Sequence, residues 1–425
     1  MKQFLFSVAV IMLSLSLKVS AQSNKCATMD NLEKRYAADP TLKSRMLASE
    51  QQISEWIAAN SNAKNGSRQS TVTIPVVFHV IWNAAIENVS DSQIQSQLNV
   101  MNRDFSFLNT DTLLSTHPFY NLCADTKIEF CLAKRDPLGN ATTGITRTQT
   151  AIAAWNSNIR EDIRSTVKGG KDNWDPTKYL NIYVVNLGAE TLGFATFPED
   201  LAASPELDGV FIRYEAFGTV GTAGSGDFSD NSGGRTATHE IGHWLNLRHI
   251  WGDTICGNDF VADTEIAVGR NFNCPTFPHR PNSSCGSGAN GEMYMNYMDY
   301  VDDTCMNMFS KGQAARMNAA LNGPRAAILS SNGCQPPTGT NDVQLSNAIS
   351  ISPNPSNGVF RIDISAKNNE NYTATILNML GQTVKELNIN DSNTLVDCND
   401  LTSGAYFIKI SGQNKSAVKK VFVTR

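Results

Sequence analysis

Three of the six histidines of this 425-residue chain lie in one short segment, His239-Glu-Ile-Gly-His243-Trp-Leu-Asn246-Leu-Arg-His249. On an α-helix each residue turns the chain by about 100°, so His239 and His243 lie about 40° apart on one face. Two imidazoles in this arrangement suit one Zn²⁺ ion, at about 2.0–2.1 Å from each nitrogen. Glu240 lies beside the first of them, within reach of a water molecule on that metal. The segment therefore predicts a zinc site on a helix over residues 234–245.

The third histidine constrains the backbone. His249 lies six residues beyond His243, about 240° further round a continuous helix, and would point away from the metal. It can join only if the helix ends between them, which commonly requires a residue with positive φ. Asn246 is the non-glycine type that best tolerates this conformation, so we predict a left-handed Asn246 and a return of His249 to the zinc. Two surface histidines on an ordinary helix are the alternative, and the third histidine disfavours it.

The first 21 residues read as a secretory signal peptide. Lys2 precedes a mostly apolar run over 4–17, and Val19-Ser20-Ala21 is a small-residue cleavage site. An uncleaved anchor is the alternative, but the run is short for a bilayer, and no later stretch of about 18 apolar residues follows. The formal charge of −5 and the lack of a basic cluster argue against a nucleic-acid partner. We expect a secreted or surface-attached protein with no transmembrane segment.

The composition and hydrophobic pattern of the sequence change twice along the chain. Residues 22–67 are polar and in part helical, from 31 to 59, and an exposed linker follows over 60–70. A capping box at Ser90 and Gln93 then starts a helix, among strand-like runs at 73–81, 127–132, 179–185, 192–197 and 209–214. This mixture predicts an α/β domain over 68–334. A linker at 335–342 precedes residues 343–425, where short strands at 359–364, 373–377, 405–410 and 418–423 predict an all-β sandwich.

The histidine segment resembles the zinc motif of the metzincin metallopeptidases, although their familiar version has Gly where this chain has Asn246. Further on, Met295-Asn-Tyr-Met298-Asp-Tyr300 is similar to the Met-turn of the pappalysin family. The resemblance covers about 70–330 and implies a metzincin-like catalytic domain with a mixed twisted sheet and an active-site helix. Met298 would then lie beneath the zinc, and Tyr300 would approach it. The alternative for these side chains is ordinary core packing.

The resemblance implies a secreted zinc-dependent endopeptidase. Three neutral histidines leave a fourth zinc position for water, Glu240 would act as general base on the zinc-activated water, and Tyr300 would donate a hydrogen bond to the oxyanion. An extended substrate would pair with the edge strand over 192–197. The family often prefers Arg or Lys just after the scissile bond, and Asp302 and Asp303 would supply the complementary charge.

The nine cysteines are expected to be partly paired, because disulfides persist outside the cytosol, and their odd number leaves at least one unpaired. The family likeness implies the pairs Cys256–Cys285 and Cys274–Cys305. It leaves Cys123, Cys131, Cys334 and Cys398 without assigned partners. The likeness also implies a structural Ca²⁺ loop with oxygen ligands from Asp253, Asp259, Asp263 and Thr264, for which a solvated polar loop is the alternative.

Cys26 lies alone near the expected mature start. Bacterial pappalysins carry a similar propeptide cysteine that blocks the zinc, since a thiolate is a good zinc ligand. The resemblance therefore implies a latent zymogen in which Cys26 is a zinc ligand, with a candidate cut site in the exposed region Lys64–Arg68. An adventitious or intermolecular cysteine is the alternative.

The last eighty residues resemble the C-terminal sorting domain of the type IX secretion system. The matching pieces are Ile351–Gly358, Asn378–Gln382, Leu401–Tyr406 and the basic end at Lys419-Lys420. The likeness implies contact with the secretion machinery and passage through an outer membrane, and a carbohydrate- or protein-binding module is the alternative.

For the whole chain two rival hypotheses remain open. One is a peptidase of another clan with a distant Glu ligand, which His249 and Met298 disfavour, and the other is a non-enzymatic adhesin, which Glu240 disfavours.

Overall fold

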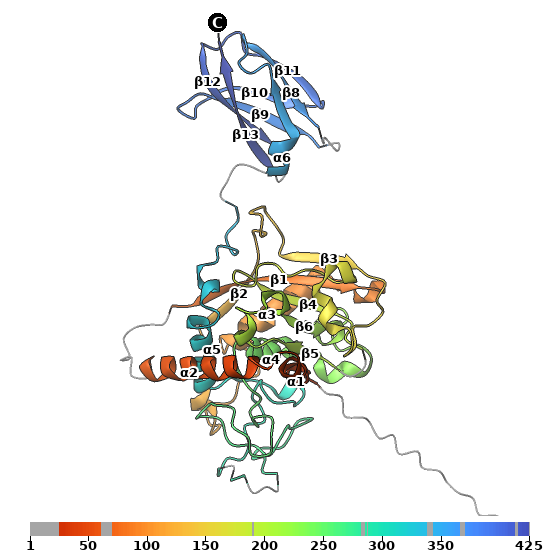
Figure 1. Ribbon diagram of the computed structural model, residues 1–425, viewed down its shortest axis with the longest axis vertical. Helices are drawn as coiled ribbons and strands as arrows, with labels where there is room; N and C mark the ends of the chain where they lie inside the picture. The colour runs from red at the N-terminus through yellow and green to blue at the C-terminus, as the bar shows by residue number, and fades with distance from the viewer. Residues whose placement is uncertain are drawn as a thin grey trace, which may run out of the picture.

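The chain forms two units, each with its own hydrophobic core (Figure 1). The computed structural model describes residues 25–60, 70–188, 191–281, 285–286, 288–337, 343–365, 370–412 and 415–424. The predicted signal peptide at 1–21 and the candidate cut site at 64–68 lie outside the described residues. The largest core is built from residues between Cys26 and Ile328, and the second from residues between Leu345 and Val423.

A six-stranded mixed sheet is the centre of the first unit. Its strands are β1 (Val72–Trp82), β2 (Ile128–Leu132), β3 (Ile145–Gln149), β4 (Leu180–Val185), β5 (Gly193–Ala195) and β6 (Val210–Arg213). The order is β2-β1-β4-β6-β5, with β3 also paired to β1, and all pairings are parallel except that of β5 with β6. The predicted α/β fold is confirmed, and β5 is its antiparallel edge strand.

The two faces of the sheet are covered differently. Alternate side chains of β1, such as Phe78 and Val80, pack with helices α3 (Asp91–Phe105) and α4 (Arg235–Trp244) in the main core. The opposite face, which includes Ile81 and Tyr183, packs on short 3-10 segments. Half of the predicted capping box is present: the Ser90 hydroxyl accepts a hydrogen bond from the Gln93 amide at 3.2 Å, but the Gln93 side chain donates to the Phe217 carbonyl instead of the Ser90 amide. Helix α4 is therefore fixed between the sheet and the loops that follow it.

The N-terminal residues pack onto this unit as two helices, α1 (Thr28–Ala38) and α2 (Leu42–Asn60), where the sequence predicted partly helical structure. The helices are separated at Asp39-Pro40, because proline disfavours helical backbone in the residue before it and has no amide hydrogen. Leu32, Leu42 and Met46 share a cluster with Phe197, next to β5. Helix α2 contacts α5 (Lys311–Asn322), as Figure 1 shows.

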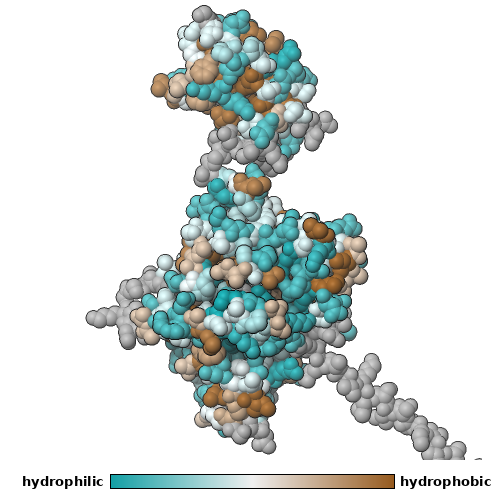
Figure 2. Space-filling view, in the orientation of Figure 1, coloured by the Kyte–Doolittle hydropathy of each residue, from teal (hydrophilic) through white to brown (hydrophobic). Residues whose placement is uncertain are grey.

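Long loops after α4 are held by disulfides. Cys256 pairs with Cys285 and Cys274 with Cys305, as the resemblance implied. A third bridge, Cys131–Cys334, ties β2 to the end of the unit across 203 residues of sequence, and it was not predicted. Cys26, Cys123 and Cys398 are free and buried. Figure 2 shows a mostly hydrophilic face with small, separate apolar areas, one of them at the end where these loops lie.

The second unit is the predicted β-sandwich. A four-stranded antiparallel sheet, ordered β10-β9-β12-β13, packs with a three-stranded sheet, ordered β11-β8-β7. The strands are β7 (Ile349–Ser352), β8 (Val359–Ile364), β9 (Tyr372–Leu377), β10 (Thr383–Ile389), β11 (Asn393–Asp397), β12 (Gly404–Ser411) and β13 (Ser416–Val423), after the short helix α6 (Val343–Ala348). Within the described residues, no helix is long and apolar enough to cross a bilayer.

Candidate zinc centre

Helix α4 ends as the sequence predicted. Asn246 has φ of 75°, in the left-handed region. Its amide donates to the His243 carbonyl at 2.9 Å, and the Leu247 amide donates to the Gly242 carbonyl at 2.8 Å. This pair of bonds is a Schellman motif, which satisfies the last carbonyls of the helix while reversing the chain. The reversal brings His249 back towards His239 and His243.

The three imidazoles converge through the same nitrogen. The Nε2 atom of His243 lies 3.2 Å from that of His239 and 3.1 Å from that of His249. Each Nδ1 faces an atom that can only accept: the Tyr297 carbonyl at 2.7 Å, the Leu247 carbonyl at 2.8 Å and an Asp253 carboxylate oxygen at 2.5 Å. The protons therefore belong on Nδ1, and the three Nε2 lone pairs face one another.

Such an arrangement fits a zinc ion. Three lone pairs cannot hydrogen-bond to one another, and a tetrahedral ion with bonds of about 2.0–2.1 Å would separate its nitrogen ligands by about 3.3 Å. Burial, together with the neighbouring His249, lowers the pKa of His239 to about 3, so the ring is neutral. The three histidines and Cys26 form the one group of metal-ligand side chains found among the described residues, with ligand atoms within 4.8 Å of one another.

The first described residues of the chain cover this centre. The Cys26 thiol lies 3.5 Å from Glu240 Oε2, and the Thr28 hydroxyl donates to the same oxygen at 2.9 Å. Thr28 also accepts a hydrogen bond from the Ala195 amide at 2.8 Å, and the Ala27 amide donates to the Gly193 carbonyl at 3.0 Å. The segment therefore occupies edge strand β5 and the general-base candidate together.

Burial raises the pKa of Glu240 to about 8, against the hydrogen bonds from Cys26 and Thr28, which lower it. The other oxygen of this carboxylate, Oε1, has no hydrogen-bond partner among the described residues. Gly193 packs directly over Glu240, since a Cβ at this position would lie 2.8 Å from the Glu240 Cγ. The carboxylate is thus buried and closely packed beside the histidines.

The predicted Met-turn lies beneath the helix. The Tyr297 carbonyl accepts a hydrogen bond from His239 Nδ1, and the next residue, Met298, is fully buried. A Cβ on Gly242 would lie 2.4 Å from the Met298 sulfur, so only glycine permits this approach. Tyr300 packs edge-on against His249, with ring centroids 5.0 Å apart, and its hydroxyl donates to the Cys26 carbonyl at 3.2 Å.

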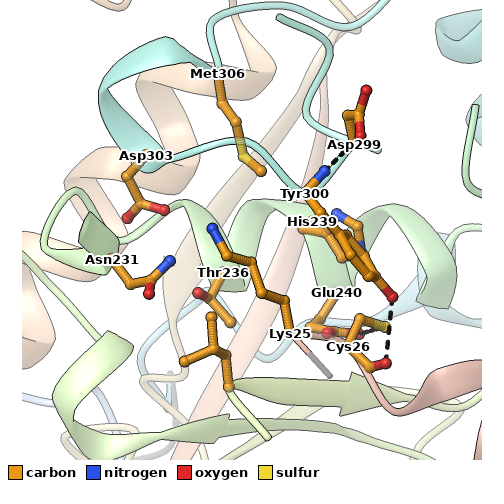
Figure 3. Close-up of a pocket in the computed structure, with 11 residues that line it drawn as sticks. Lys25, Cys26, Asn231, Thr236, His239, Glu240, Asp299, Tyr300, Asp303 and Met306 are labelled. Carbon is orange, nitrogen blue, oxygen red and sulfur yellow. Dashed lines mark hydrogen bonds between the residues drawn. The ribbon is translucent and has the colours of Figure 1, made fainter. Parts of the chain in front are cut away.

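A pocket opens beside Glu240 and holds the side chain of Lys25 (Figure 3). The Lys25 Nζ lies 3.4 Å from Asp302 Oδ1 and 3.4 Å from the Val301 carbonyl. Asp303 also lines the pocket, but its carboxylate accepts hydrogen bonds from the Gly233 and Arg235 amides at the start of α4. Of the two predicted acids, Asp302 contacts the cation and Asp303 supports the helix.

The four predicted calcium residues do not form one cluster. Asp253 bonds to His249, while Asp263 accepts hydrogen bonds from the Ser310 hydroxyl and the Gly312 amide at the start of α5. Asp259 and Thr264 do lie together, since the Thr264 hydroxyl donates to Asp259 Oδ2 at 2.7 Å, and the same hydroxyl oxygen lies 3.0 Å from the Val261 carbonyl oxygen. Burial raises the pKa of Asp259 to about 6.

Sequence reasoning missed Lys25 and Thr28 as parts of this site, and it missed Asp253 as the partner of His249. The first two stand on either side of Cys26, in Lys25-Cys26-Ala27-Thr28, and a basic and a hydroxyl residue next to a candidate blocking cysteine were the available signal. Asp253 lies four residues after His249, and metal-binding histidines usually donate their other ring N–H to a carboxylate or a carbonyl.

This fold and site define a zinc metalloprotease of the metzincin type, and comparison with known proteins agrees. Residues 164–322 match the family model for pregnancy-associated plasma protein-A, and residues 350–424 match that for the secretion system C-terminal sorting domain. An extracellular metalloprotease of Arthroderma otae is 30% identical over 286 residues, which cover 65% of this chain and 88% of that protein. An extracellular metalloprotease of Arthroderma benhamiae is 31% identical over 256 residues, covering 58% and 76%.

Two solved structures from Tannerella forsythia are also similar. Mature mirolysin in complex with a cleaved peptide is 44% identical, with a TM-score of 0.59, and the match covers 62% of this chain and 97% of that one. A promirolysin mutant is 41% identical, with a TM-score of 0.64, covering 72% and 97%. The chain belongs to the pregnancy-associated plasma protein-A family of metalloproteases, the pappalysins. Its C-terminal sorting domain marks it as a secreted protein.

The contact between Gly242 and Met298 can be tested directly. We expect Gly242→Ala to lower the thermal unfolding midpoint of the first unit by several degrees, because an added methyl group must displace the Met298 sulfur. Differential scanning calorimetry would measure this. Gly269→Ala is a matched control, since nothing lies within 4 Å of a Cβ there and its backbone is outside the left-handed region. A Gly242→Ala midpoint no lower than that of the control would contradict the packing.

Proposed function

We propose that this protein is a secreted, latent zinc endopeptidase in which His239, His243 and His249 hold the metal. The observation that carries the proposal is the convergence of three Nε2 lone pairs, each set by an acceptor at Nδ1. Zinc, when bound, supplies Lewis-acid activation of water and of the scissile carbonyl. The protein supplies the ligands, the general base and the hydrogen-bond donors around them.

Glu240 acts as general base and acid in this proposal. Its carboxylate lies beside the histidines, takes a proton from the attacking water and delivers it to the leaving amine. Tyr300 donates a hydrogen bond to the developing oxyanion. Support comes from the latent chain, where the Tyr300 hydroxyl already donates to a main-chain carbonyl, that of Cys26. Met298 supports the site from below through its contact with the active-site helix.

Replacement of the general base tests this assignment. Glu240→Gln should lower kcat by about 10²–10⁴-fold on a fluorogenic peptide, because the amide cannot accept the proton, while the zinc content measured by mass spectrometry stays at one ion per chain. Glu206→Gln, an exposed position, is the control. Full activity of the Glu240→Gln enzyme would end the proposal. A wild-type chain that holds zinc but cleaves no peptide would favour the adhesin alternative.

We place the propeptide at 22–67, after a signal peptide at 1–21, and the catalytic domain at 68–334. In the latent chain Cys26 is the fourth zinc ligand, and its sulfur belongs to the same four-residue group as the three histidines. Thr28 adds a second restraint, since its hydroxyl bonds to Glu240 and occupies an edge-strand amide. Cleavage in the region Lys64–Arg68 would then release the segment.

The contacts of Cys26 and Thr28 should each slow self-activation independently. Cys26→Ser should speed self-activation of the full-length zymogen because it removes the sulfur ligand. Thr28→Val should also speed it, because Glu240 loses a hydrogen bond, and the double variant should be fastest. Gel densitometry of the intact chain over time measures the rates, and Ser54→Ala on the exposed side of α2 is the control. Rates equal to that of the control would contradict the latch.

We also propose a preference for Arg or Lys just after the scissile bond. In the latent chain the pocket beside Glu240 already holds a basic side chain, that of Lys25, at 3.4 Å from Asp302. Both side chains are mostly buried, at 15% and 18% exposure, so solvent screens their attraction only in part. A substrate side chain of the same charge fits the same place once the propeptide leaves.

Matched peptides that differ only at this position test the preference. The activated wild-type enzyme should cleave before Arg faster than before Leu. Asp302→Asn should reduce the ratio of the two kcat/KM values about tenfold, since hydrogen bonds to charged groups contribute about 1.5–3 kcal/mol. Asp230→Asn, at an exposed position, is the control. Equal cleavage of both peptides by the wild-type enzyme would refute the preference.

Two further assignments complete the proposal. Calcium binding by the loop 253–264 stays a prediction, and the best support is the pair Asp259 and Thr264 with the Val261 carbonyl, three hard oxygens in one tight loop. The linker is placed at 335–342 and the sorting domain at 343–425. We propose that this domain contacts the type IX secretion machinery and brings the enzyme outside the cell or onto its surface.

A further inference from the structure

The residue that turns the chain towards His249 is held by two groups from distant segments. The Asn246 side-chain amide donates to the carboxylate of Glu199, and its main-chain carbonyl accepts a hydrogen bond from Arg316 Nε at 2.8 Å. All three residues are buried, with exposures of 0% for Asn246, 8% for Glu199 and 1% for Arg316. The bend is therefore fixed through both its side chain and its backbone.

Glu199 comes from the substrate side of the site. It follows edge strand β5 in the short 3-10 segment Pro198–Asp200. Phe197, which directly precedes that segment, packs edge-on against the His243 ring at 5.6 Å between centroids. The strand expected to bind substrate is thus linked to the ligand segment at two points, one ring contact and one hydrogen bond.

Arg316 comes from α5, on the other side of Asn246. Its guanidinium forms a two-pronged ion pair with Glu50 of propeptide helix α2, in which Nη1 lies 2.7 Å from Oε1. Its remaining nitrogen, Nε, is the one that donates to the Asn246 carbonyl. The planar guanidinium can make these contacts together because its donors are fixed in one plane.

An asparagine at this position needs such support more than a glycine would. Glycine adopts positive φ without a steric cost, whereas a side chain in the left-handed region is strained. The same side chain, however, gives this chain a tether that glycine lacks. The ring of His249 lies three residues beyond the bend, so its place in the metal group depends on the Asn246 backbone.

We propose that Glu199 and Arg316 are positioning residues for the zinc ligand His249, and that both act through Asn246. The inference rests on the proposed zinc site and adds to it a connection from the substrate-binding strand. Groups that orient metal ligands from outside the ligand set typically change metal affinity by about 10–100-fold when removed. Metal retention is therefore the property to measure.

The experiment uses the full-length chain with Glu240→Ala, which prevents self-cleavage. The zinc-loaded protein is mixed with a chromogenic chelator, and the rate of zinc loss is recorded for Glu199→Met, Asn246→Gly, Arg316→Lys and the double variant Glu199→Met/Asn246→Gly. Glu206→Met, an exposed glutamate in the next 3-10 segment, is the matched control. Calorimetry of the zinc-free proteins reports whether each variant folds.

We expect each single variant to lose zinc about tenfold faster than the control. The double variant should be no faster than Asn246→Gly alone, because Glu199 acts only through the amide that glycine removes. Glu199→Gln, which keeps an oxygen acceptor, should recover most of the retention. If Glu199→Met does not fold, the comparison of Asn246→Gly with the control decides.

Three outcomes would overturn the inference. Zinc loss at the control rate in Asn246→Gly would show that the tether has no effect on the ligand. If the two fold-increases in the rate of zinc loss multiply in the double variant, Glu199 acts elsewhere than through Asn246. If Arg316→Lys loses zinc at the control rate, Arg316 does not position His249. A wild-type chain that binds no zinc at all would instead defeat the proposed metal site, which is a different result.

Discussion

The structure depends on the convergence of three imidazole nitrogens that cannot bond to one another. Each ring of His239, His243 and His249 carries its proton on Nδ1, because the facing atom is a carbonyl or a carboxylate oxygen. The His243 Nε2 atom lies 3.1–3.2 Å from the other two, and lone pairs this close in a buried space repel unless a cation lies among them. This repulsion arises at the end of helix α4. The helix, the bend at Asn246 and the Met-turn must therefore be rigid enough to keep the three rings together.

The local part of this site was predictable. Helical periodicity placed two histidines on one face, and the same geometry required a bend before the third, which only a residue tolerant of positive φ could supply. Asn246 has that conformation. The main strands were also predicted, because their buried apolar runs are long. Strand β3 was not, since four of its five residues are polar and none is buried, and it is recognisable as a strand only through its pairing with β1.

What the sequence could not provide is contact between distant segments. The bond from Thr28 to Glu240 joins residues 212 apart, and the pair Glu50–Arg316 joins residues 266 apart. The Cys131–Cys334 bridge spans 203 residues and has no periodic signal either. The predicted calcium loop shows that residues close in sequence need not share a partner. Four oxygen-bearing residues close in sequence were expected to act together, yet Asp253 and Asp263 bond to separate partners.

These long-range contacts place the first described residues of the chain against the candidate site. Lys25 lines the pocket beside Glu240, Cys26 lies among the histidines, and the Thr28 hydroxyl binds Glu240 and the Ala195 amide of β5. Under the proposed function, residues 25–28 thus contact four features that a substrate would use: the pocket, the metal-ligand group, the general base and the edge strand, the last also through the Ala27 amide. In the proposed latent chain, the contacts expected of a peptide substrate are therefore made by the chain's own N-terminal segment.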